Sequence, residues 1–140
     1  MANVLKLDPQ PTNRCFGCGG ANPFGMKLPF ELDRDARRTS GRFVLGPNYA
    51  GGAGFAHGGI IAVVLNEAMG KLSKLTEERA VTAEMSIEYR KPVPVDQEIV
   101  AEGWQVDASA RNRFRVAEIH DAQGNLLARG KARFVVLRGT

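Results

Sequence analysis

Cysteine, aromatic residues and long apolar stretches are all scarce in this 140-residue sequence, which has two cysteines and 7% aromatic residues. Two cysteines are too few for a disulfide framework. The longest apolar run, residues 60–65, is far shorter than the roughly 20 residues that span a membrane. The first residues also lack the charged and apolar regions of a secretory signal. We therefore expect a soluble cytoplasmic protein with no membrane partner.

Net charge is also small, but it is unevenly placed. The chain carries +4 overall, yet residues 111–138 hold seven basic and two acidic residues. Such a segment suits either a polyanionic partner or a solvated strand face. No recognition helix, zinc-finger spacing or aromatic RNA-binding signature accompanies the charge. We therefore expect no nucleic acid partner, and a phosphorylated cofactor is the better candidate.

Length and apolar content suffice for one globular domain. Domains usually contain roughly 100–200 residues, and 44% of this chain is hydrophobic. Residues 1–14 are polar and contain Pro9 and Pro11. We therefore expect an N-terminal arm, followed by a single domain over residues 15–140.

The hydrophobic pattern predicts one long helix and about six strands. Residues 58–75 are apolar over too long a run for a strand, follow a glycine-rich loop and end near Lys71 and Lys74. The other apolar segments alternate or lie between turn residues, as strands do. The expected strands are residues 26–32, 39–45, 81–90, 98–106, 113–120 and 126–137. One helix among so many strands indicates an α+β class, with an antiparallel sheet wrapped around a central helix.

Two polar residues interrupt the otherwise apolar helix. Asn66 and Glu67 need partners there, because an unpaired buried amide costs about 1–3 kcal/mol and a buried carboxylate more. Asn66 is either a satisfied core amide or a functional side chain, and Glu67 could pair with Arg90 or Lys71. A stripe of small residues with a spacing of four contains Asn66 together with Gly58, Ala62 and Gly70.

The helix begins with the sequence His57, Gly58, Gly59, which leaves backbone N–H groups uncovered by side chains. Such groups at a helix N-terminus stabilise an oxygen atom that gains negative charge during a reaction. His57 could shape this loop through backbone hydrogen bonds or contact the reacting group directly.

Four segments of the chain have an order and spacing found in one known family. They are HGGIIAVVLNEA at residues 57–68, CFGCG and NPFGM within residues 15–26, VTAE and YRKPVPV within residues 81–95, and DAQG followed by Ala128. Together they resemble the hotdog-fold acyl-CoA thioesterases of the PaaI-like group, in the branch with an amino-terminal CxxCG…NPxG motif. The resemblance extends over residues 15–137.

This resemblance implies a fold, an activity and an assembly. The fold is the hotdog, an antiparallel sheet around one long helix, so residues 15–140 form a single hotdog thioesterase-like domain. The activity is hydrolysis of acyl-CoA thioesters to free acid and coenzyme A, without a metal or a cofactor beyond the coenzyme A of the substrate. The protomers form homodimers that assemble into tetramers, and the active sites lie at the dimer interface.

The resemblance also implies roles for individual residues. The amide at the helix N-terminus, here that of Gly58 next to Gly59, polarises the thioester carbonyl. A carboxylate nine residues after His57 attacks the carbonyl or activates water. A hydroxyl on the next strand, here Thr82, orients that carboxylate or water from the other subunit. At the carboxylate position this chain has Asn66.

Asn66 leaves three interpretations open, because an amide is neither a nucleophile nor a general base near neutral pH. In the first, Asn66 positions water and His57 or Glu67 supplies the basicity. In the second, the protein binds acyl-CoA without cleaving it, as a sensor or regulator. In the third, the asparagine is an engineered replacement for aspartate. The first interpretation, a thioesterase, is the expectation that we carry forward.

Four basic residues are candidates for binding the phosphates of coenzyme A. The resemblance places Arg90 and Lys91 at the mouth of the substrate tunnel, and Arg111 and Arg113 follow in the neighbouring strand or loop. Arginine suits phosphate because its planar fork forms paired hydrogen bonds with the oxygens.

The pairing of the last two strands gives a further expectation. A hairpin turn near residues 123–124 would set Arg115 opposite Lys131 and Arg113 opposite Arg133. Like charges that face each other across strands need solvent or a bridging anion. A coenzyme A phosphate would be such an anion.

Cys15 and Cys18 have the CxxC spacing of many zinc ligands. A tetrahedral zinc site usually has four ligands, and the sequence offers no second pair. We therefore expect a packed structural turn without metal, the alternatives being a site shared between subunits and a redox role.

Overall fold

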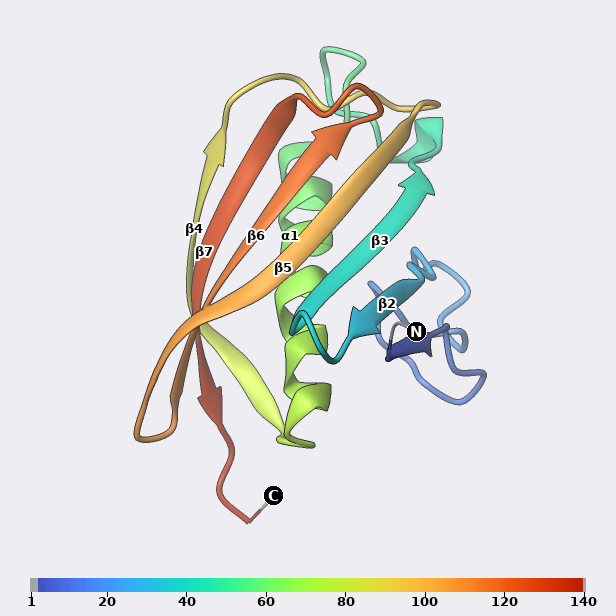
Figure 1. The fold of residues 1–140 in the computed structure, drawn as a ribbon. Helices are drawn as coiled ribbons and strands as arrows, with labels where there is room; N and C mark the ends of the chain where they lie inside the picture. Colours follow the sequence, from blue (N-terminus) through green and yellow to red (C-terminus); the bar gives the residue numbers. More distant parts are fainter. Residues whose placement is uncertain (1–2, 140) are drawn as a thin grey trace.

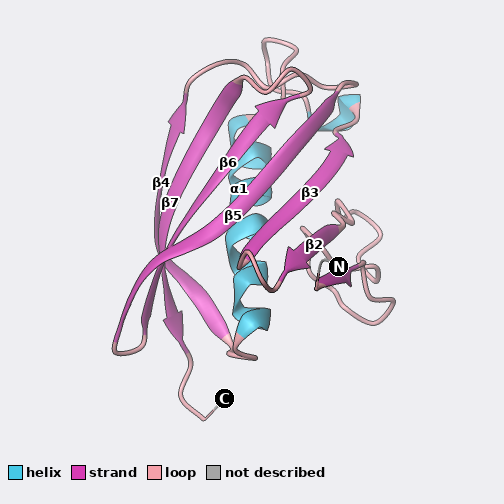
Figure 2. Cartoon of the chain, viewed as in Figure 1, coloured by secondary structure: helices cyan, strands magenta, loops and turns pink. Residues whose placement is uncertain are grey.

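A seven-stranded antiparallel sheet curves around one long helix in the computed structural model, which describes residues 3–139 (Figures 1 and 2). The strands are β1 Val4–Leu7, β2 Phe30–Asp33, β3 Arg38–Val44, β4 Ala80–Tyr89, β5 Glu98–Ser109, β6 Asn112–Asp121 and β7 Leu126–Val136. Their order across the sheet is β1-β2-β3-β5-β6-β7-β4. The expected α+β architecture is confirmed.

The additional strand, β1, lies in the segment that was expected to be an arm. It pairs with β2, with Leu5 opposite Leu32 and Leu7 opposite Phe30. Leu5 and Leu7 are half-buried and their neighbours are exposed, so the short strand has one apolar face. Two leucines between polar residues are too short a pattern to distinguish a strand from a loop.

The predicted helix over residues 58–75 is confirmed, with a change of geometry near its end. It consists of α1 Gly58–Gly70 and the 3-10 helix η2 Lys71–Leu75, and a short 3-10 turn, η1 Pro47–Tyr49, precedes it. The buried face of α1 packs on the sheet and consists of Ile61, Val64, Leu65, Ala68 and Met69. Within residues 3–139, no helix combines the length and the apolar character needed to cross a membrane.

The predicted pairing of β6 with β7 is wrong by one residue. Arg115 lies opposite Ala132 and not opposite Lys131, and Arg113 is displaced from Arg133 in the same way. A bulge close to the β6–β7 turn shifts the register. Because side chains alternate along a strand, one extra residue in β7 changes which β7 side chains lie on the same face as Arg113 and Arg115 of β6.

Arg115 lies on the inner face, at the end of α1, because side chains alternate along β6 and it shares a face with the buried Ala117. Its side chain is buried, with 2% of the residue exposed. Nη1 donates to the carbonyl oxygen of Met69 and to Ser73 Oγ, each at 3.1 Å. The guanidinium also lies 4.7 Å from the ring centre of Phe134. A buried cation that binds the last carbonyls of a helix stabilises the helix end, so Arg115 has a structural role.

Strand β4 forms one edge of the sheet. It pairs with β7 on one side and, within the described chain, with no strand on the other. Residues are exposed along its length, and Val81 and Tyr89 are about half exposed. A ten-residue edge strand of this kind presents unpaired backbone groups that can pair with another chain.

Candidate functional site

The N-terminus of α1 has one backbone donor that the protein does not use. His57 caps the helix, and its Nδ1 accepts from the Gly59 N–H at 2.8 Å. The carbonyl oxygen of His57 accepts from the N–H groups of Ile60 and Ile61. In the part of the chain that the structure describes, no group accepts from the Gly58 N–H. Of the two roles expected for His57, the structure shows the first: it shapes the loop through hydrogen bonds with the backbone. These bonds leave the Gly58 N–H free.

A hollow of about 320 Å³ lies beside this amide. Tyr89 at the end of β4 closes one side, and its hydroxyl donates to the carbonyl oxygen of Gly58 at 2.9 Å. Arg90 and Lys91 follow Tyr89 directly and line the same hollow. The other lining residues are Ala56, Ile61, Pro92 and Val93. Sequence reasoning placed the two basic residues here but missed Tyr89, although its position next to Arg90 was a signal.

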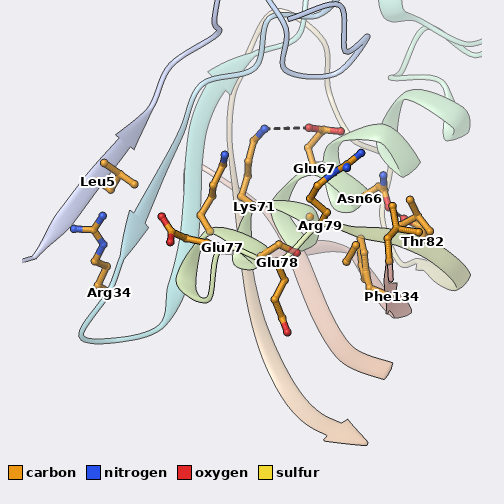
Figure 3. Close-up of a pocket in the computed structure, with 16 residues that line it drawn as sticks. Leu5, Arg34, Asn66, Glu67, Lys71, Glu77, Glu78, Arg79, Thr82 and Phe134 are labelled. Atoms are coloured by element: carbon orange, nitrogen blue, oxygen red, sulfur yellow. Dashed lines mark hydrogen bonds and ion pairs between the residues drawn. The ribbon is translucent and has the colours of Figure 1, made fainter. Parts of the chain in front are cut away.

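Asn66 and Thr82 form a second polar group, two turns further along α1. The Thr82 hydroxyl donates to Asn66 Oδ1 at 2.6 Å. Both residues line a cavity of about 730 Å³ at the end of the molecule where α1 passes into η2 (Figure 3). The resemblance implied a hydroxyl from the other subunit, but here Thr82 and Asn66 belong to one chain. A β-bulge between Thr82 and Glu84 alters the side-chain direction at this point of β4.

The two polar groups are separated within one protomer. Gly58 and Asn66 are eight residues apart on α1, which corresponds to about 12 Å along the helix axis. They line different hollows. A single thioester carbonyl therefore cannot contact the Gly58 amide and the Asn66 side chain of the same chain.

Glu67 points away from Asn66 and is already paired. Its Oε1 lies 3.5 Å from Lys71 Nζ, so the pairing with Lys71 is the one that the structure shows, not the pairing with Arg90. Its Oε2 accepts from Cys15 Sγ at 3.8 Å. Figure 3 shows Glu67 and Lys71 joined on one side of the larger cavity, with Asn66 and Thr82 together on another.

Arg111 and Arg113 lie at the opposite end of the sheet from Arg90. The Arg113 guanidinium forms paired bonds with Glu78, Nε to Oε1 at 3.1 Å and Nη2 to Oε2 at 2.7 Å. This contact lowers the pKa of Glu78 below its ordinary value. Arg111 Nη1 donates to the carbonyl oxygen of Val136. Within one protomer the structure therefore does not bring the four expected phosphate-binding residues together.

The two cysteines lie in the loop between β1 and β2, packed against α1. Cys18 is buried and Cys15 half-buried, which agrees with the expected packed turn. Sequence reasoning missed that Glu67 joins them, because nothing in the sequence connects positions 52 residues apart. Burial raises the pKa of the Cys18 thiol to about 12. Within the described chain, Cys15, Cys18 and Glu67 are the one group of three metal-ligating side chains whose ligand atoms converge.

Comparisons with known proteins identify the family of this chain. A family model described as Thioesterase superfamily matches residues 53–128, more than half of the chain. Acyl-coenzyme A thioesterase THEM4 of Mus musculus is 32% identical over 90 residues, which are 64% of this chain and 39% of that protein. The chain thus spans about two fifths of the length of the curated relative that it matches.

Solved structures share the fold at low sequence identity. The thioesterase superfamily protein RHA08564 has a TM-score of 0.80 and 23% identity, over 87% of this chain and 60% of that one. The PaaI protein of E. coli has a TM-score of 0.70 and 15% identity, over 74% and 75%. The smu.793 protein of Streptococcus mutans UA159, bound to acetyl CoA, has a TM-score of 0.68 and 21% identity, over 71% and 81%. The fold is therefore the hotdog of this group, and the chain belongs to the thioesterase superfamily.

Proposed function

We propose that this protein hydrolyses acyl-CoA thioesters at a site built by two copies of the chain. The observation that carries the proposal is the free Gly58 N–H at the N-terminus of α1, beside a hollow lined by Arg90 and Lys91. A helix N-terminal amide stabilises the oxygen of a reacting carbonyl, and the two cations suit coenzyme A phosphates. The thioesterase name of THEM4 and the acetyl CoA bound to smu.793 support this choice of substrate class.

Two hydrogen bonds explain why a second copy is needed. Thr82 binds Asn66 near one end of α1, and Tyr89 binds Gly58 at the other, so β4 runs antiparallel along the helix. The free edge of β4 and the small-residue stripe of α1 thus belong to one face of the molecule. Pairing of two β4 edges about a two-fold axis makes the two helices antiparallel. Gly58 of one copy then approaches Asn66 of the partner subunit. A homodimer, which we expect to assemble further into a tetramer, completes the site.

This site can polarise the thioester carbonyl and can position a water molecule, but it lacks a carboxylate that would remove a proton from that water. The Gly58 N–H donates to the thioester oxygen as negative charge develops there. Asn66 Oδ1 accepts from Thr82, so the amide of Asn66 offers its N–H groups to a water or to the substrate. Hydrolysis by water without a general base is slow, since such a base typically contributes about 10²–10⁴-fold.

A second candidate function, acyl-CoA binding without cleavage, is favoured by the absence of a free base in the described site. Because His57 Nδ1 accepts from Gly59, the neutral ring carries its proton on Nε2. Glu67 is held by Lys71 and Cys15. Both side chains proposed to replace the missing carboxylate thus already have partners within the protein. A sensor or regulator would need only the binding part of the site.

A proline substitution tests the role of the Gly58 amide. Gly58→Pro deletes the N–H at the first helical position, where proline is well tolerated, and His57 before it already has the extended backbone that proline requires. The matched control, Gly58→Ala, keeps the N–H, and its Cβ would lie 3.5 Å from the Tyr89 hydroxyl, an ordinary contact.

We expect Gly58→Pro to lower kcat/KM for acyl-CoA by about 10²–10³-fold relative to Gly58→Ala. The measurement is release of free thiol from a panel of acyl-CoA esters by folded protein. Equal rates in the two variants would contradict the proposed role of the amide. Tight binding of acyl-CoA without thiol release by the unaltered protein would identify the second candidate function.

A further inference from the structure

The packed turn that contains Cys15 and Cys18 brings three metal-ligating groups together at one side of the larger cavity. The two sulfur atoms and a carboxylate oxygen of Glu67 all lie within 4.8 Å of one another. Cys15 Sγ is 3.8 Å from Glu67 Oε2. Around a tetrahedral zinc ion, bond lengths of about 2.3 Å to sulfur and 2.0–2.2 Å to oxygen place those two atoms about 3.6 Å apart. The observed separation is therefore already close to that of a metal site.

The turn is built rigidly against the helix. The Gly19 N–H donates to the carbonyl oxygen of Cys15 at 2.9 Å, and the Cys15 N–H donates to Asn13 Oδ1 at 2.8 Å. A Cβ at Gly17 would lie 2.6 Å from Cγ of Glu67, so the backbone of the turn touches the carboxylate side chain directly. Packing of the turn against Glu67 and hydrogen bonds within the turn therefore hold the ligand atoms near one another.

The charges around the cluster suit a divalent cation. Two thiolates and one carboxylate carry −3, and a dication together with the Lys71 ammonium carries +3. Lys71 Nζ lies 3.5 Å from Glu67 Oε1, and its side chain is only 16% exposed. A neutral cluster is favoured in a half-buried setting, where an uncompensated charge is costly.

A redox role suits the cluster less well than metal binding. Reactive cysteines have an exposed sulfur, whereas Cys18 is buried. A bound metal ion removes the thiol proton, because coordination requires the thiolate. Metal binding therefore uses a buried thiol that thiol–disulfide chemistry would leave inert.

We propose that Cys15 Sγ, Cys18 Sγ and a Glu67 carboxylate oxygen bind a zinc ion that fastens the β1–β2 loop to α1. Borderline-soft zinc accepts this mixture of sulfur and oxygen ligands, whereas magnesium and calcium bind oxygen alone. Water takes the fourth position, since the cluster has three protein ligands. The sequence predicted no metal because it showed only two ligands, and the fold supplies the third.

Cobalt(II) titration of the full-length, reduced and chelator-treated protein tests the site without any acyl-CoA, so its result is independent of the proposed function. We expect one equivalent to produce thiolate-to-cobalt charge-transfer absorption and the visible bands of a tetrahedral ion, and zinc to abolish both. Absence of charge-transfer absorption in the folded, unaltered protein would overturn the proposal. A Cys15–Cys18 disulfide that persists after treatment with a reductant would also overturn it.

Variants assign the ligands. We expect Cys15→Ser and Cys18→Ser each to reduce the charge-transfer intensity. We expect Glu67→Gln to retain it and to weaken zinc affinity by more than the roughly 10–100-fold effect of losing a residue that only supports a ligand. Glu31→Gln, at an exposed position of β2, is the matched control and should bind zinc as the unaltered chain does. Equal zinc affinities for Glu67→Gln and Glu31→Gln would exclude Glu67 as a ligand and overturn the three-ligand site. Where a serine variant fails to fold, the titration of the unaltered protein decides the proposal.

Discussion

Among single residues, Asn66 is the one on which the activity proposed for this thioesterase-superfamily chain depends most. It occupies the position at which the resemblance implies a carboxylate, and its Oδ1 accepts from the Thr82 hydroxyl at 2.6 Å. An aspartate at this position would have the same size and could accept the same hydrogen bond. The supporting hydroxyl is thus present, while the group that would remove a proton from water is not.

Replacing Asn66 by aspartate should therefore increase hydrolysis. We expect Asn66→Asp to raise kcat/KM for acyl-CoA at least about tenfold, because general-base assistance is commonly about 10²–10⁴-fold. Thiol release measures the rate, and Asn66→Ala, which adds no base, should show no increase. If the aspartate variant turned over no faster than the parent protein, position 66 would have no part in the chemical step.

Glu78, another residue that lines the larger cavity, provides a test of electrostatics. Its ion pair with Arg113 lowers the pKa below the ordinary 4.5. The pair therefore stabilises the fold above about pH 4.5, and this contribution is lost as the pH falls through the lower native pKa. We expect Glu78→Gln to be less stable by about 1 kcal/mol at pH 7 and equal to the parent protein near pH 2. Urea unfolding at the two pH values measures this, and a pH-independent difference would contradict it.

Among the elements, α1 could be predicted well and the β6–β7 pair could not. The apolar run and the His57, Gly58, Gly59 entry define α1 in local sequence, so its start and its polar residues were identified correctly. The pairing of β6 with β7 depends on one extra residue at a bulge, and nothing in the local pattern marks it. That bulge decides which residue of β7 lies opposite Arg115.

The same limit applies to the candidate site. The uncovered Gly58 amide follows from the local His57, Gly58, Gly59 motif and was expected from the sequence. The resemblance implied that Thr82 acts at position 66 from the other subunit, whereas the structure shows the two side chains in contact within one chain. The contact of Cys15 with Glu67 depends on how a loop packs against a helix 52 residues later. Sequence periodicity describes each element but not which elements meet, so this cluster required the fold.

Arg115 at the end of α1 gives a prediction for this element. We expect Arg115→Met to destabilise the protein by about 3 kcal/mol, because the buried carbonyl of Met69 and hydroxyl of Ser73 lose a charged donor. Denaturant unfolding measures the change. Lys131→Met, which removes an exposed cation from β7, should remain within about 0.5 kcal/mol of the parent protein. Similar losses in the two variants would show that Arg115 does not stabilise the helix end.

For the whole molecule, the proposed shared site rests on the separation of two polar groups within one chain. The amide half lies at the N-terminus of α1 beside Arg90 and Lys91. The second half consists of the side chains of Asn66 and Thr82 and lies about 12 Å away along α1. The exposed edge of β4 runs alongside both halves. In the function that we propose, a two-fold dimer through this edge joins the halves of different chains.

Complementation between two inactive variants tests this central claim most directly. One variant combines Gly58→Pro with Asn66→Asp, and the other carries Asn66→Ala alone. In a mixed dimer, one of the two shared sites has Gly58 from one chain and the aspartate from the other. After random subunit exchange, we predict recovery of about a quarter of the activity of the Asn66→Asp protein, because half of the dimers are mixed and each has one intact site. Thiol release that stays at the level of the separate variants, although mixed dimers are shown to form, would contradict a site shared between two chains.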